Sequence, residues 1–247
     1  MTIEDMEYFF ENTSIGTHME WAEFKRCATF RPTNTYRTCE DKLQNVLSCF
    51  DSHTDDAWWY FEAICEDLPT QHIPRLLLEV VYQSYRVSYT RMLGCICECI
   101  GMETPAMKKQ RIEENKRRLK RYINEDGTIT LYRGIGEGSL LPEYAVSYTV
   151  DKAVAEFFTE NHKLVHESKF SGIYSRTVSI DKVLFYSNLR KEKEVFIIPD
   201  KLTELACEDE DNISQYTLGL HNFEEYFPTE YAKFAAEHDV TQELESM

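Results

Sequence analysis

The sequence predicts an α+β protein, with a mostly helical region over residues 1–125 and a strand-rich domain over 126–247. Glycine marks the division, because three of the nine glycines precede residue 127 and six follow from there on. Apolar residues change their spacing at the same place, from helical in the first half to alternating in the second. A turn signal, Asn124-Glu-Asp-Gly127, stands at the expected boundary.

Three apolar stripes with helical spacing predict helices in the first half. The first holds Leu43, Val46, Leu47 and Phe50, and the second holds Trp58, Phe61, Ile64 and Cys65. The third runs over 73–89, with Pro74 at a first-turn position. Such stripes indicate packed core helices rather than a cofactor site.

The second half alternates between apolar and polar residues, which predicts strands over 128–133, 173–180 and 194–198. A short helix is expected over 151–159, capped by Thr149 or Asp151. Its predicted buried side holds Ala153, Val154, Phe157 and Phe158.

Composition excludes several classes of protein. The apolar content of 43% and aromatic content of 13% argue against disorder. The net charge of −16 argues against a general nucleic-acid coat protein. No apolar run has the roughly 18 residues of a membrane helix, and the acidic start is unlike a secretory signal. We therefore expect a cytoplasmic protein, of the producing or a target cell, without a membrane partner and with reduced cysteines.

One segment has the opposite charge to the rest of the chain. Residues 108–121 contain eight basic side chains and only Glu113 and Glu114 as acidic ones. A solvated helix between the two halves is the favoured interpretation. A phosphate-binding or partner-binding face is the alternative.

Three patterns do not support the sites that they suggest. Arg133-Gly-Ile-Gly-Glu-Gly138 follows a strand but opens no helix, which a dinucleotide-binding fold would need. Cys95-x-Cys97-x-Cys99 lacks the paired spacing of zinc ligands, and Cys65 and Cys207 stand apart, so inert thiols are favoured. His162 and His166 are expected in a solvated loop, with no third ligand beside them. We expect no catalytic metal.

A more specific constellation comes in three parts. Leu131-Tyr-Arg-Gly134 places an arginine on a strand, and Val146-Ser-Tyr-Thr-Val150 places two hydroxyls on one face of another. Lys191-Glu-Lys-Glu194 then places two carboxylates at i and i+2, on the same side of a beginning strand. Each part alone is ordinary, but their occurrence together in this order is hard to assign to chance.

In these motifs, over about residues 128–200, the chain resembles the mono-ADP-ribosyltransferases of the Arg–Ser–Glu type. Tyr132-Arg-Gly134, Ser147-Tyr-Thr149 and Glu192-Lys-Glu194 fit the three family motifs. The resemblance implies a split β-sandwich of two small sheets with flanking helices. It also implies NAD+ as substrate, bound in the cleft between the sheets.

The resemblance implies a role for each motif residue. Glu194 would stabilise the positive charge that develops on the ribose when nicotinamide leaves. Arg133 would hold the ribose or diphosphate, and the backbone of Gly134 would meet the nicotinamide amide. Ser147 would orient Arg133 or Glu194. Thr149 would brace the two sheets, and Tyr148 stands between these two as a further cofactor-binding residue.

The resemblance also bears on the acceptor of ADP-ribose. Glu192 would activate an arginine of a target protein, and Tyr186 and Asn188 would present that acceptor. A nucleic-acid acceptor, held by the basic segment 108–121, is the alternative. An inactive binding module is a further alternative, although the complete Arg–Ser–Glu set speaks against it.

The biological setting follows only from the family. An enzyme that consumes NAD+ and modifies cellular molecules would be toxic. The resemblance therefore implies an intracellular toxin, effector or phage-defence enzyme with a neutralising antitoxin or chaperone partner. The helical first half would serve target selection or partner binding.

Overall fold

The protein combines helices with one antiparallel sheet, as expected for the α+β class. Its structure, a computed structural model, describes residues 1–82, 85, 87–207 and 210–238. The end of the predicted catalytic domain, 239–247, lies outside the described residues. The chain forms two compact units, Met1–Met107 and Lys108–Met247. No helix in the described ranges is long and apolar enough to cross a membrane.

Unit 1 is helical. Its helices are α1 (Ile3–Asn12), α2 (Ile15–His18), α3 (Trp21–Ala28), α4 (Tyr36–Leu47), α5 (Asp56–Ile64), η1 (Cys65–Asp67), η2 (Thr70–His72), α6 (Ile73–Leu76), the π-helical turn η3 (Leu77–Val81) and α7 (Tyr89–Gly101). Side-chain caps begin several of them, such as Thr35 on α4 and Ser88 on α7. The helix predicted over 73–89 is shorter in the structure, because α6 and η3 together end at Val81. Residues 83, 84 and 86 of the predicted range lie outside the described residues.

Aromatic and aliphatic side chains fill the core of unit 1. Phe24, Tyr60 and Phe61 are fully buried, together with Leu43 and Leu47 of the first predicted stripe. The cysteine pattern differs in one respect from expectation. The thiols of Cys65 and Cys99 are close enough to the Cys95 thiol to influence its pKa, so Cys65 is not isolated.

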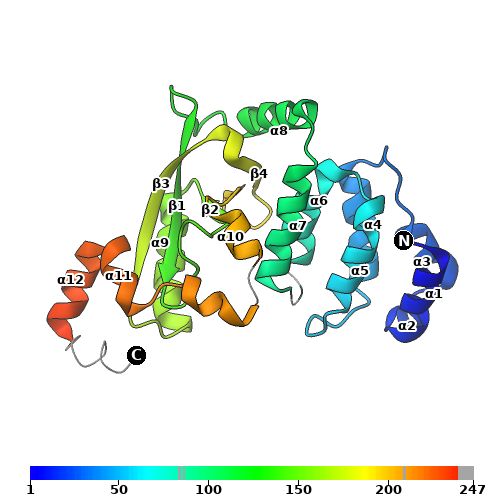
Figure 1. Cartoon of the computed structure of the whole chain (residues 1–247), viewed down its shortest axis with the longest axis horizontal. Helices are drawn as coiled ribbons and strands as arrows, with labels where there is room; N and C mark the ends of the chain where they lie inside the picture. Colours follow the sequence, from blue (N-terminus) through cyan, green and yellow to red (C-terminus); the bar gives the residue numbers. More distant parts are fainter. Residues whose placement is uncertain (83–84, 86, 208–209, 239–247) are drawn as a thin grey trace. The chain divides into compact units, whose positions relative to one another are not determined.

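Unit 2 is built on a five-stranded antiparallel sheet in the order β3-β1-β2-β5-β4. Figure 1 labels β1, β2, β3 and β4 of this sheet. The strands are β1 (Thr128–Gly136), β2 (Ser147–Thr149), β3 (Ser171–Ser179), β4 (Val183–Ser187) and β5 (Glu194–Ile197). Helix α9 (Lys152–Val165) packs along β1 and β3. The remaining helices are η4 (Ile180–Lys182), α10 (Leu202–Ala206), η5 (Glu210–Tyr216), α11 (Leu220–Tyr226) and α12 (Pro228–Glu237).

The sheet is joined unevenly. β1 and β3 pair along nine positions, whereas β1 meets β2 only at Tyr132 and Thr149 among the described residues. A long hairpin, β3–β1, thus adjoins a three-stranded part, β2–β5–β4, at one place. The expected two separate sheets are not observed, because this pairing links the two parts into one.

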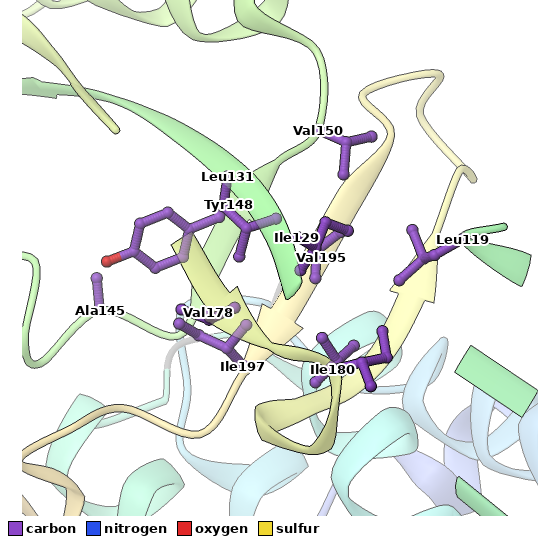
Figure 2. Close-up of a cluster of buried hydrophobic side chains, with 11 residues drawn as sticks. Leu119, Ile129, Leu131, Ala145, Tyr148, Val150, Val178, Ile180, Val195 and Ile197 are labelled. Carbon is purple, nitrogen blue, oxygen red and sulfur yellow. The ribbon is translucent and has the colours of Figure 1, made fainter. Parts of the chain in front are cut away.

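A cluster of buried apolar residues holds the sheet together (Figure 2). It joins Ile129 and Leu131 of β1 to Val195 and Ile197 of β5, with the Tyr148 ring among them. Leu119, which follows helix α8 (Pro105–Arg118), also belongs to this cluster.

Helix α8 explains why the compact units divide earlier than the expected boundary near residue 125. The Arg111 guanidinium and the Asn115 side-chain amide both donate to the backbone carbonyl of Val183, at 2.6 and 2.8 Å. The whole basic segment, 108–121, therefore belongs to the sheet unit. The turn expected at 124–127 is present, and Gly127 has the positive φ of 80° that it requires.

Candidate active site

A cavity of about 250 Å³ opens in unit 2 at the junction of β1 and β2. It is lined by Tyr132, Arg133, Gly134, Ser147, Tyr148, Thr149, Val154, Ala155, Phe158, His162, Arg190, Glu192 and Glu194. All three sequence motifs thus meet at one cavity, although 61 positions separate Arg133 from Glu194. Antiparallel pairing of β2 with both β1 and β5 brings them together.

Glu194 begins β5 and has a side chain only 13% exposed. The Ser147 hydroxyl donates to its Oε1 at 2.5 Å, and an Arg190 guanidinium nitrogen lies 3.5 Å from its Oε2. Burial raises the pKa of Glu194 above its usual range, while the Ser147 bond and the Arg190 charge oppose that shift. The site therefore holds a carboxylate in a partly dry environment.

Glu192 lies on the loop before β5, and the same Arg190 nitrogen lies 3.3 Å from its Oε2. One guanidinium therefore bridges the two carboxylates, which places both on the same side, as their spacing predicts. The Thr149 hydroxyl donates to the Glu192 carbonyl at 2.7 Å. Thr149 thus braces this loop against β2, whereas the sequence predicted that it would brace two sheets.

Arg133 crosses the junction between the two parts of the sheet. Its Nη1 donates to the Ser147 carbonyl at 2.6 Å, so Ser147 contacts both Arg133 and Glu194. The buried Arg133 Nε has no hydrogen-bond partner among the described residues. A buried donor left without a partner is costly, and a bound ligand is one way in which it can be satisfied.

The Tyr148 side chain lies beneath the Arg133 guanidinium group as a cation–π partner. Its ring is buried, lies 6.0 Å from the Arg133 guanidinium carbon, and directs its hydroxyl to the Pro142 carbonyl. The Tyr148 side chain is therefore occupied within the core, because alternation along β2 turns it away from Ser147 and Thr149.

Gly134 is required by the helix that covers it. A Cβ added there would lie 2.5 Å from the Ala155 carbonyl oxygen and 2.7 Å from the Thr159 nitrogen. Glycine thus allows α9 to approach β1 closely and to place Phe158 against the cavity. The close backbone approach expected at this glycine is therefore made by a helix.

Helix α9 contributes a side chain that the sequence analysis missed. His162 lies on this helix and lines the cavity, whereas it was expected in a solvated loop. Burial, together with the charges of His166 and Arg133, lowers its pKa. The helix extends to Val165 and capping by Asp151 sets its start. With this phase, Ala155 is buried and Phe157 is 65% exposed, so the predicted buried side was wrong at Ala153 and Phe157.

Two predicted acceptor-presenting residues do not line the cavity. Tyr186 lies on β4, and its ring packs against the apolar cluster of Figure 2. The Asn188 side chain accepts from the Lys193 backbone N–H at 3.2 Å and so shapes the loop. The cavity instead receives Arg190, whose place could not be read from the sequence, because the loop reaches it through positive φ angles at Lys191 and Lys193.

The assembled groups permit a defined kind of chemistry. A carboxylate largely removed from solvent can stabilise positive charge that develops on a ligand, and a second carboxylate beside it can accept a proton. A fixed arginine can hold an anionic group, and Val154, Ala155 and Phe158 offer an apolar wall to a flat ring.

Comparisons with protein-family models, with curated proteins and with solved structures give no match for this chain.

Proposed function

We propose that unit 2 is a mono-ADP-ribosyltransferase, which cleaves NAD+ and transfers ADP-ribose to an arginine of a target protein. One observation carries this proposal: Ser147 contacts Glu194 through its hydroxyl and Arg133 through its carbonyl, within one cavity that also holds Glu192. The three motifs that suggested the family are thus joined by direct contacts. Chance matches scattered along a chain would have no reason to meet.

The form of the sheet supports the finer fold proposal, a split β-sandwich of the ADP-ribosyltransferase type. The hairpin β3–β1 and the part β2–β5–β4 meet through a single register pair. The cavity opens at that junction. We propose that NAD+ enters between these two parts of the sheet.

The cavity suits one end of NAD+. Its volume of about 250 Å³ is below the roughly 300 to 1,000 Å³ of pockets that enclose a whole drug-sized ligand. We propose that it takes the nicotinamide ribose, with the nicotinamide ring against Phe158. The adenylate end would lie outside. Arg133, with its buried Nε, would donate to the ribose or the diphosphate.

The proposed reaction begins with the bond between nicotinamide and ribose. The bonding electron pair leaves with nicotinamide, and the ribose carbon becomes oxocarbenium-like. Ionised Glu194 stabilises this charge and accepts a hydrogen bond from the 2′-hydroxyl. Because its pKa is raised by burial, activity is expected to fall with decreasing pH earlier than an ordinary glutamate would require.

Glu192 acts on the acceptor in this proposal. A guanidinium is a weak nucleophile until it shares or loses a proton. Glu192, whose side chain is 26% exposed, can bind such a group from solvent and accept that proton. The contact of Glu192 with the guanidinium of Arg190 supports arginine as the acceptor class.

A nucleic-acid acceptor is the second candidate. The guanidinium of Arg118 donates to the Tyr186 carbonyl at 2.9 Å, which places one end of α8 at the strand that leads into the Arg190–Glu192 loop. Several basic residues of the segment are exposed there and on the rest of the helix, namely Lys108, Lys109, Lys116, Arg117, Lys120 and Arg121. An anionic acceptor could follow this face toward the cavity.

The test is transfer of label from adenylate-labelled NAD+ to a cell extract, with Glu194→Gln as control. Products are divided into protease-sensitive and nuclease-sensitive fractions. Label in protein that hydroxylamine releases, and that the variant lacks, is expected. Label in nucleic acid would favour the second candidate. No label with either protein would favour a binding module and contradict the enzymatic proposal, and equal label with both would contradict the role given to Glu194.

A further inference from the structure

Arg190 occupies an unusual position within the cavity. One of its terminal nitrogens lies 3.3 Å from a Glu192 oxygen and 3.5 Å from a Glu194 oxygen. The protein thus presents a guanidinium of its own to both carboxylates. From this geometry we infer that Arg190 is a modification site, to which the protein transfers ADP-ribose from NAD+ in an intramolecular reaction. The inference rests on the proposed function.

The loop is built to hold Arg190 in this place. Asn188 and Thr149 anchor the peptide group between Glu192 and Lys193 from its two polar ends, because the Asn188 side chain accepts from the Lys193 N–H and the Thr149 hydroxyl donates to the Glu192 carbonyl. Lys191 and Lys193 have φ angles of 63° and 49°, a conformation that costs non-glycine residues of order 1 kcal/mol each. Strained backbone conformations of this kind occur most often at functional sites, which supports a functional position for Arg190.

Other arginines of the cavity region are not placed for reaction. Arg133 is committed to the Ser147 carbonyl and lies against the Tyr148 ring. Arg176 forms an ion pair with Asp200. The Arg190 side chain, by contrast, is 53% exposed while it contacts both carboxylates, so it has room to move toward a ribose. Arg190 therefore has both freedom to move and a proton acceptor, Glu192, in contact with its guanidinium.

The step balances without a further reactant. The bond between the ribose C1′ and nicotinamide breaks, and its electron pair leaves with neutral nicotinamide. A nitrogen of Arg190 forms the new bond to C1′ and loses one proton, which Glu192 accepts and passes to water. The modified guanidinium keeps its positive charge. The products are nicotinamide, one proton and ADP-ribosylated Arg190.

The experiment follows the full-length protein with NAD+ alone. Nicotinamide is measured, and ADP-ribose is located by peptide mass spectrometry with fragmentation that preserves glycosidic bonds. Trypsin provides a second readout, because a modified Arg190 resists cleavage before Lys191. Arg190→Lys keeps a cation but removes the guanidinium, and Arg37→Lys is the matched change at an exposed position of α4. Glu194→Gln tests dependence on the proposed chemistry.

The expected result is ADP-ribose on Arg190, with a fraction of molecules modified per unit time that does not depend on protein concentration. Arg190→Lys and Glu194→Gln should lose the label at this peptide, and Arg37→Lys should keep it. Nicotinamide release with an unmodified Arg190 would overturn the inference and leave the proposed function standing. A fraction modified per unit time that rises in proportion to protein concentration would also overturn it, since the reaction would be intermolecular. No nicotinamide release at all would overturn both.

Discussion

Each unit of the protein contains a glutamate side chain that is largely removed from solvent, and the surroundings of the two differ. In unit 1 the Glu79 side chain is fully buried, with Arg75 Nε at 2.6 Å and the Tyr36 hydroxyl at 2.7 Å. The Arg75 guanidinium also stacks on the Tyr36 ring at 4.0 Å. In unit 2, Glu194 faces a cavity, and its neighbour Arg133 keeps a buried nitrogen without a partner among the described residues. The partners around Glu79 indicate a structural charge, whereas the unpartnered Arg133 nitrogen beside the cavity indicates a donor that a ligand can satisfy.

The largest expected effect is on stability, in unit 1. Arg75→Ala should lower the free energy of unfolding by about 3 to 5 kcal/mol, because it leaves Glu79 buried without its cation. Arg37→Ala, on an exposed position of α4, should change it by less than about 0.5 kcal/mol. Denaturant unfolding measures both. Equal changes in the free energy of unfolding for the two variants would show that the Arg75–Glu79 ion pair does not stabilise unit 1.

The second effect is on the reaction, in unit 2. Glu192→Gln should lower ADP-ribose transfer to a small guanidino acceptor by about a hundredfold, since it removes the proposed proton acceptor. Hydrolysis of NAD+ should fall less, because water needs no contact with Glu192. Rates of transfer and of nicotinamide release provide the comparison, with Glu160→Gln on α9 as control. A loss of the same size in both rates would contradict a role specific to the acceptor.

Replacement of glycine by alanine should change the stability in opposite directions in the two units. Gly134→Ala would bring a Cβ to 2.5 Å from the Ala155 carbonyl oxygen and should destabilise by about 1 to 3 kcal/mol. Gly94→Ala adds a Cβ with nothing within 4 Å, within α7, and should stabilise by up to about 1 kcal/mol. Thermal unfolding decides this. A stabilised Gly134→Ala protein would show that α9 does not need its close approach to β1.

The smallest effect is a change in pH dependence. Ser147→Ala removes a hydrogen bond that lowers the pKa of Glu194, so that pKa should rise further. The reaction needs the ionised form, and the acid limb of kcat/KM should therefore move to higher pH. Near neutral pH the rate should fall by about tenfold, as for one lost bond to a charged group. Thr177→Ala, an exposed change on β3, should leave the profile in place. If the acid limb of kcat/KM stays in place in Ser147→Ala, the ionisation that controls this limb is not that of Glu194.

The parts of the fold that alternate or repeat in sequence were predictable. The spacing of Leu131-Tyr-Arg-Gly134 and Ser147-Tyr-Thr149 identified β1 and β2, and the apolar stripes identified α4 and α5. Contacts that depend on distant packing were not. His162 was missed because polar Glu160 and Asn161 hide the end of α9, whose phase depends on its approach to Gly134. Arg190 was missed because lysines at positions 191 and 193 give no sign of positive φ angles.

The most direct test of the central claim is nicotinamide release from NAD+ by the purified full-length protein and by Glu194→Gln. The account predicts release by the unmodified protein and a loss of about 10² to 10³ in rate for the variant, as for one preorganised contact with developing charge. Equal melting temperatures of the two proteins would show that the fold is retained. Equal rates of release, or the absence of both release and NAD+ binding in the unmodified protein, would contradict it.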